Sequence, residues 1–179
     1  MATSAATELW DVLVVEAAGE SSLWADAALP DGDQRRVPVF STLCEPAFAL
    51  GVETIYEGYL LHYGRPRLFV PADDDGALLL GDYLYAHGLV RIAATGSVAA
   101  VHDLAELISL CAHSRAEERD GDSAVWAATA ALLGEGVLDG PRSALRDGGD
   151  PSLLEQAARL AAGPEAVERA HAAHRLNVG

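Results

Sequence analysis

The spacing of apolar residues is the feature that most constrains what this chain can fold into. The clearest example is the stretch SVAAVHDLAELISLCAHSRAEE, which begins with Ser97, a typical helix N-cap. The apolar residues after it recur every three or four positions, as on one face of a helix: Val98, Val101, Leu104, Leu107, Ile108 and Cys111. The polar residues of this stretch are expected on other faces: His102, Asp103, Glu106 and Ser109.

Similar spacing predicts helices along most of the chain. No segment has the alternation of a strand, and the short apolar piece RLFV, which precedes Pro71, predicts a loop. Pro46 is expected to kink or divide the second of the predicted helices, and DGPRSALRDGGDPS from Asp139 predicts a turn. The helical segments are TELWDVLVVEAAGE, VFSTLCEPAFALGVETIYEGYLLH, GALLLGDYLYAHGLVRIAA, the Ser97 stretch, SAVWAATAALLGEGVL, LLEQAARLAAG and PEAVERAHAAHR.

Length and composition place these helices in one folded unit. A chain of 179 residues, half of them hydrophobic, suits a single domain with a sizeable core. We therefore expect an all-α, single-domain bundle of about six to eight helices over residues 1–179.

The charge and the cysteines bound the functional classes. A formal net charge of −15 argues against a nucleic-acid partner, because phosphate contacts need clustered basic side chains. No apolar run approaches the ~20 residues that a membrane-spanning helix needs, and no secretory signal precedes the first helix. Cys44 and Cys111 are unclustered, which fits free thiols in a reducing compartment, so the expected location is the cytoplasm.

Acidic and histidine groups were the first candidates for a metal site. Three consecutive residues, Asp73–Asp75, cannot all face one ion from a helix, and they precede a predicted helix, so we expect Asp75 or its neighbours to cap it. Glu53 and Glu57 lie four positions apart and can share a cation, which makes them weak metal candidates, but two glutamates on an exposed helix face are the preferred interpretation. His171 and His174 are also one turn apart, but no further zinc ligand is evident, so a solvated surface pair is expected.

Two small basic groups are candidates for binding a phosphate. Arg35 and Arg36 lie in DGDQRRVP, and Arg65 and Arg67 lie in HYGRPR. Arginine binds phosphate oxygens in a bidentate manner, but ordinary surface arginines are the preferred interpretation of both groups.

Several motifs, taken in order, resemble the trans-type polyprenyl diphosphate synthase family, which has the all-α isoprenoid synthase fold. GALLLGDYLYAHG resembles the family stretch A-L-L-x-G-D-Y-L-x-A-R-A, and VETIYEGYLLH resembles V-E-x-I-H-x-x-S-L-L-H. GRPR resembles the end of R-R-G-R-P, GDQRRVP resembles G-G-K-R-L-R-P, and ATAAL resembles K-T-A-x-L. The resemblance covers roughly residues 32–133.

The departures from the family pattern concern the catalytic groups. His62 is followed directly by Tyr63 and GRP, where the family has its first aspartate-rich motif, and nothing resembles the second motif. An ungapped alignment instead places Glu53 and Glu57 over the first and last aspartates, but it matches fewer residues. Lysines that hold diphosphate in the family are replaced by Gln34 and Ala128.

These departures set the functional expectation. Family members use magnesium held by the aspartates to stabilise the departing diphosphate. The resemblance therefore implies a shortened, catalytically degenerate protein without a cofactor, acting in isoprenoid biosynthesis as a non-catalytic subunit or regulatory partner. It implies a homodimer, or a heterodimer with a catalytic prenyl synthase. The candidate diphosphate-binding residues are Arg35, Arg65 and Arg67.

Two alternatives remain at the level of the sequence. The first is a binding module that holds a prenyl or lipid chain in a cavity between helices, lined by the small residues of GDYLYAHG and AATAAL. Close helix packing also accounts for those small residues. The second alternative is a residual prenyltransferase that uses magnesium and the side chains Glu53, Glu57, Arg65 and Arg67.

Overall fold

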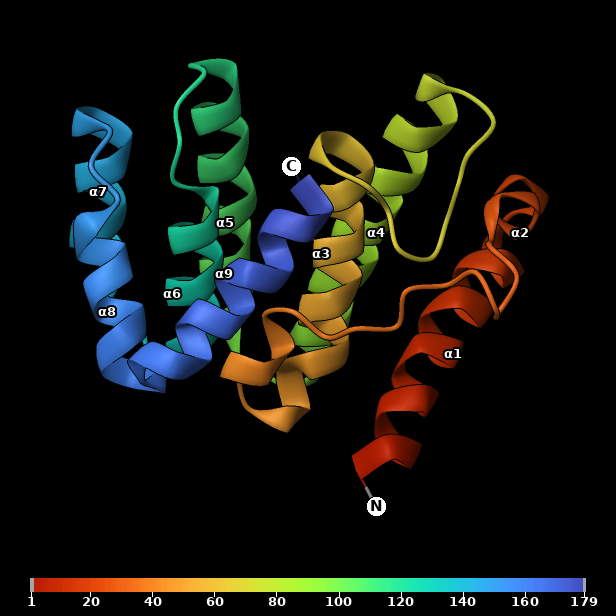
Figure 1. The fold of residues 1–179 in the computed structure, drawn as a ribbon, viewed down its shortest axis with the longest axis horizontal. Coiled ribbons are helices and arrows are strands. Elements are labelled where there is room, and N and C mark those ends of the chain that lie inside the picture. The colour runs from red at the N-terminus through yellow and green to blue at the C-terminus, as the bar shows by residue number, and fades with distance from the viewer. Residues whose placement is uncertain (1, 179) are drawn as a thin grey trace.

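The structure is a computed structural model that describes residues 2–178, with side chains described from Leu9 onward. All regular elements in this range are helical, which confirms the expected all-α class; one isolated bridge pairs Ala28 with Phe69 (Figure 1). The α-helices are α1 (Ala2–Glu20), α2 (Ser22–Ala27), α3 (Ala49–Tyr63), α4 (Asp74–Ala94), α5 (Val98–Ala116), α6 (Asp122–Ala131), α7 (Asp139–Gly148), α8 (Ser152–Ala162) and α9 (Pro164–Val178). Two short 3₁₀ segments, Ser41–Leu43 and Pro46–Phe48, precede α3.

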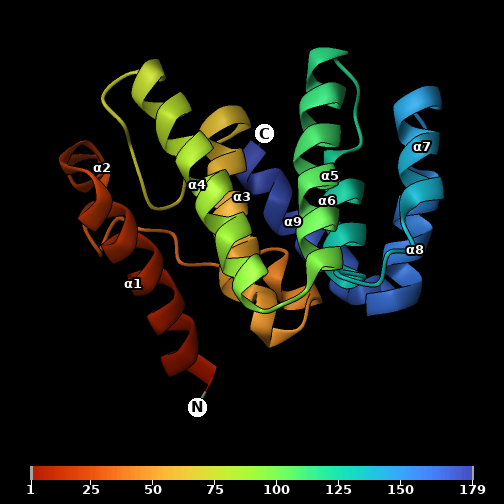
Figure 2. The same cartoon turned by 180° about the vertical axis from the view of Figure 1, so that it is seen from behind.

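The helices form a row rather than a closed barrel. In Figures 1 and 2, α3, α4 and α5 stand side by side in the middle of the row. The first two helices, α1 and α2, lie at one end, and α7 and α8 lie at the other. The last helix, α9, crosses from α8 back to α3, so the C-terminal residues end beside the C-terminal end of α3.

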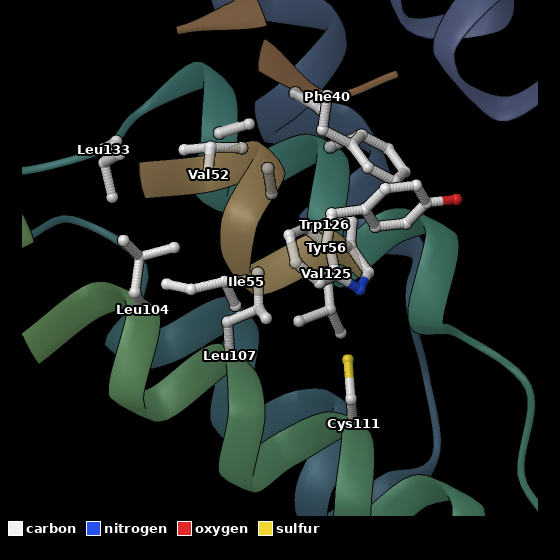
Figure 3. Close-up of a cluster of buried hydrophobic side chains, with 14 of the residues drawn as sticks. Phe40, Val52, Ile55, Tyr56, Leu104, Leu107, Cys111, Val125, Trp126 and Leu133 are labelled. Carbon is white, nitrogen blue, oxygen red and sulfur yellow. The ribbon is translucent and has the colours of Figure 1, made fainter. Parts of the chain in front are cut away.

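Buried apolar side chains form two clusters. The larger cluster lies between α3, α5, α6, α8 and α9, and its centre is the contact of Tyr56 with Trp126 and Phe40 (Figure 3). The smaller cluster joins α1, α2 and α4 to the segment after α3 through Trp10, Leu13, Phe69 and Leu84, among others. Because α3 contributes to both clusters and every residue from Gly51 to Leu61 is buried, it is the central helix of the core.

Glycines let α3 and α4 approach closely. Gly51 and Gly58 on α3 face Gly88 and Gly81 on α4: a Cβ at Gly58 would lie 2.9 Å from the Gly81 carbonyl oxygen, and one at Gly88 would lie 3.0 Å from that of Gly51. Backbone oxygens at these distances cannot move aside without shifting a helix. The glycines of GDYLYAHG are therefore used for helix packing, as are the fully buried alanines of AATAAL.

Several sequence-based expectations about helix ends are confirmed. The Ser97 hydroxyl accepts a hydrogen bond from the Ala100 amide, and α9 begins at Pro164. The acidic run before α4 does cap the helix, but the capping residue is Asp73, whose Oδ1 accepts from the Gly76 amide at 2.7 Å. The second predicted segment is confirmed only in part: Pro46 opens a 3₁₀ segment ahead of α3, but residues 39–45 contain only the 3₁₀ segment Ser41–Leu43 and no α-helix.

Other expectations about the helices are wrong. The predicted turn at Asp139 is the helix α7, and its physical basis is a face on which Arg142 and Leu145 are buried three positions apart. The short helix α2 was not predicted either, so with α2 and α7 the described residues contain nine α-helices instead of six to eight. Asp103, expected off the apolar face of α5, is buried because Arg142 Nη1 donates to its carboxylate at 2.9 Å.

The α3–α4 packing gives a stability prediction. Gly58→Ala should lower the free energy of unfolding by about 1–3 kcal/mol, since its Cβ would collide with a backbone oxygen. Gly140→Ala in α7 is the matched control: nothing lies within 4 Å of its Cβ position, so the change should be neutral or slightly stabilising. Urea denaturation measures both, and equal effects would contradict the close approach.

Candidate functional site

The two glutamates proposed as a cation site do share a cation, but that cation is Arg67. Both carboxylates project from α3 at positions one turn apart and are fully buried, and Arg67 is 1% exposed. Arg67 Nη1 lies 2.7 Å from Glu53 Oε2, and Arg67 Nε lies 2.9 Å from Glu57 Oε2. We call this group the Arg67 cluster; it consists of Glu53, Glu57 and Arg67.

The remaining carboxylate oxygens of the Arg67 cluster are also satisfied. Glu57 Oε1 accepts hydrogen bonds from the backbone amides of Arg67, at 2.6 Å, and Leu68, at 2.8 Å. Glu53 Oε1 accepts from the amide of Val39 at 3.0 Å and from the hydroxyl of Ser41 at 2.6 Å. No oxygen of either carboxylate is left without a donor.

Aromatic rings enclose the arginine. The Arg67 Cζ atom lies 4.9 Å from the centre of the Trp10 ring and 4.8 Å from that of Tyr56, so the guanidinium makes cation–π contacts with both rings. Burial by itself lowers the pKa of Arg67, but the charges of Glu53 and Glu57 outweigh it, and the pKa is raised above its ordinary value. The guanidinium is therefore a fixed positive charge inside the protein.

This geometry leaves no room for a divalent metal at the two glutamates. Magnesium prefers six oxygen ligands, several of them water, and these carboxylates are sealed from solvent and already paired. Within the described part of the chain, no three His, Cys, Asp or Glu side chains come together as a metal site would require.

The other two candidate arginines lie elsewhere. Arg35 Nη1 donates to Asn177 Oδ1 at 2.9 Å, and its Nη2 donates to the carbonyl oxygens of Arg65, at 2.9 Å, and Pro66, at 3.1 Å. The Arg65 amide donates to the Asn177 carbonyl at 2.7 Å. These contacts join the segments before and after α3 to the end of α9. The guanidinium donors of Arg35 are directed at carbonyl and amide oxygens of the chain, whereas Arg67 is buried against the two glutamates.

A second polar group, missed in the sequence, lies where α3, α5, α6 and α9 meet. Tyr59 donates its hydroxyl hydrogen to Asp122 Oδ2 at 2.5 Å, and Arg115 Nε donates to the same oxygen at 2.6 Å. Arg115 Nη2 also donates to the Tyr59 hydroxyl oxygen at 2.7 Å. Burial, followed by the charge of Asp122, raises the pKa of Tyr59, so this phenol stays protonated.

His174 is part of the same region and corrects an expectation. His171 and His174 are not a solvated pair: they are 7% and 3% exposed. His174 Nδ1 lies 2.8 Å from the Tyr56 hydroxyl, in the middle of the main core. Burial, followed by the charge of Arg115, lowers the pKa of His174 to about 4. Its ring is therefore neutral at pH 7, and it serves as a core residue.

A hollow of about 280 Å³ borders this second group and is lined in part by Arg115, Asp122 and His174. The titratable groups near it already have partners: the Tyr59 hydroxyl is bonded to Asp122, and His174 to Tyr56. None of them is poised as a free base or nucleophile toward the hollow. Tyr59 lies far from Arg115 and Asp122 in the sequence, and the three form no motif, so the sequence did not predict that they meet. The spacing of His171 and His174 was the only pattern in the sequence that pointed to this region.

Comparisons of the sequence and the structure with known proteins identified no related protein. No protein-family model matches the chain, and neither a curated protein nor a solved structure shows significant similarity to it. Among residues 2–178, no helix combines the length and the apolar character needed to cross a bilayer.

The Arg67 cluster gives the first prediction about this region. Arg67→Met should lower the free energy of unfolding by about 3–5 kcal/mol, because it leaves two carboxylates buried without their cation. The exposed Arg169→Met on α9 is the matched control and should change stability by less than about 0.5 kcal/mol. Chemical denaturation that found the two variants equally stable would show that Arg67 does not hold this region together.

His174 gives a prediction about pH. A histidine whose pKa falls from about 6.5 in the unfolded chain to about 4 in the folded protein binds its proton more readily when unfolded. Stability should therefore decrease as the pH falls from 7 to 4, by roughly 2–3 kcal/mol from this residue. His174→Gln should have a smaller decrease over the same range in urea denaturation. An unchanged pH dependence would contradict the assignment.

Proposed function

We propose that this protein is a non-catalytic relative of the polyprenyl diphosphate synthases that acts by binding a protein partner. The relationship rests on the order of motifs between residues 32 and 133. The observation that supports the loss of catalysis is the Arg67 cluster. The acidic pair on the helix that resembles the family's metal-binding helix is already bonded to a cation of the same chain, Arg67.

Ionisation of an allylic diphosphate requires cations that stabilise the departing charge. The ungapped alignment would assign this task to Glu53 and Glu57, but a metal at these oxygens would have to displace Arg67 and the donors of Val39 and Ser41. Burying the displaced groups without partners would cost several kcal/mol. The residual-enzyme alternative is therefore the least favoured.

The structure does not support the lipid-binding alternative at the small residues that suggested it. The small residues that were candidates for lining a cavity are occupied in helix contacts: Gly81 and Gly88 against α3, and Ala127, Ala128 and Ala130 in the core. A function that depends on association with another protein then accounts best for a folded, degenerate relative.

Two measurements test the proposal. The purified protein, given magnesium and labelled allylic and homoallylic diphosphates, should form no prenyl product. Prenyltransferase activity that coelutes with this 18.7 kDa chain during purification would refute the loss of catalysis. A tagged copy expressed in its native cells and stabilised by cross-linking should be recovered with a second protein. Recovery of the tagged chain alone would count against the partner role.

A further inference from the structure

An apolar hollow opens between α2 and the start of α4, away from the polar groups described above. Its volume is about 370 Å³. The apolar residues that line it come from α2, from the segment after α3 and from the first turns of α4: Leu23, Trp24, Val70, Pro71 and Leu79. We call this the α2–α4 hollow. In Figure 1, α2 lies beside the loop that leads into α4, at the end of the row of helices.

The α2–α4 hollow exposes large apolar side chains. Leu23 is 71% exposed, Val70 61% and Leu79 59%. Scattered exposed apolar residues need no explanation, but several around one concave site are typical of a surface that another molecule covers.

The walls of the hollow are held in place by contacts of their own. The Val70 amide donates to the Ala27 carbonyl at 2.7 Å, which fixes α2 against the segment after α3. The Trp24 ring lies on the Tyr83 ring of α4, with centroids 4.2 Å apart. Because the site is already formed, a partner would order few side chains on binding.

The charges around the hollow select the kind of partner. Asp26, Asp73 and Asp75 line it together with the apolar residues, and no basic side chain does. A second copy of the chain would bring the same carboxylates to the interface, and an anionic membrane would be repelled. A partner that combines apolar side chains with lysine or arginine at their flanks satisfies both parts of the surface.

We infer that the α2–α4 hollow is the docking site for an amphipathic segment of a partner protein, with an apolar face and flanking lysines or arginines. This inference deepens the proposed function, on which it rests, by naming the surface and the chemistry of the partner. The apolar face covers Leu23, Val70 and Leu79, and the basic flanks pair with the three aspartates.

The sequence offers a selective probe of this site. The chain contains no lysine, so carbodiimide coupling to a lysine side chain reports only contact with another molecule. The probe is an acetylated synthetic helical peptide of leucine and lysine with one apolar face. A scrambled peptide of the same composition, without that face, is its control. Trp24 is a second reporter, because Trp10 and Trp126 are buried and respond weakly to an added quencher.

The expected result is cross-linking of the amphipathic peptide to Asp26, Asp73 or Asp75, with protection of Trp24 from quenching. Affinity should fall at least fivefold in Leu23→Ser/Leu79→Ser and in Asp26→Asn/Asp75→Asn. It should change less than twofold in the exposed controls Leu160→Ser/Leu176→Ser and Asp120→Asn/Asp147→Asn, which carry the same chemical changes elsewhere.

Several outcomes would overturn the inference. If all variants bind the peptide equally, or if the scrambled peptide binds as well, then binding reflects general charge attraction and not a specific site. Protection of Trp24 by phosphatidylcholine vesicles but not by peptide would identify a lipid site, and self-association abolished by Leu23→Ser/Leu79→Ser would identify a second copy. If Leu23→Ser/Leu79→Ser still binds a native partner protein, the proposed docking site is wrong, but the proposed partner role stands. Formation of a prenyl product would refute the proposed function whether or not the peptide binds.

Discussion

The arrangement of this protein depends on one buried arginine between two glutamates. Arg67 connects α3 to the segment that follows it, and through its Nη1 bond to the Val37 carbonyl, at 2.9 Å, to the segment that precedes it. The rings of Trp10 and Tyr56 close around it, which also attaches α1. A buried ion pair adds little net stability compared with apolar packing, but loss of one member is costly because the other charge remains. The cluster therefore specifies how these segments meet.

The α3–α4 crossing is the second constraint, and it acts on the same helix. Glycines at Gly51 and Gly58 bring α4 against one face of α3, while the Arg67 cluster occupies another. Every residue from Gly51 to Leu61 is buried as a result. The helix that resembles the metal-binding helix of polyprenyl synthases thus has no face open to a substrate along this stretch, which supports the proposal of a non-catalytic role.

Much of the fold could be predicted from the sequence because helix spacing and capping are local. The apolar periodicity identified α5, and Ser97, Asp73 and Pro164 have the roles that their chemistry favours at helix ends. The helix α7 was missed because its buried face includes Arg142, whose charge is matched only by Asp103 on another helix. In the sequence, a charged residue such as Arg142 is expected on the surface. In the structure it lies in the core, because its partner comes from a distant helix.

The candidate site was harder to predict for a related reason. The spacing of Glu53 and Glu57 allowed a shared cation, but it did not show that both side chains are buried, and spacing alone does not distinguish a metal from a guanidinium supplied by the next loop. His174 was expected in solvent because nothing near it in the sequence shows that α9 crosses back to Tyr56. In each case the partner is distant in the sequence, and only the packing of helices brings it close.

The most direct test of this account is whether a divalent ion reaches the Arg67 cluster. In nitrogen-15 NMR spectra, the Nε–H signal of Arg67 reports the hydrogen bond to Glu57. With excess Mg²⁺, which is diamagnetic, and a diphosphate analogue present, this signal should keep its position and its intensity. A shift or loss of the Arg67 signal that saturates with Mg²⁺ would place a metal between Glu53 and Glu57, and it would contradict the conclusion that these carboxylates serve the fold.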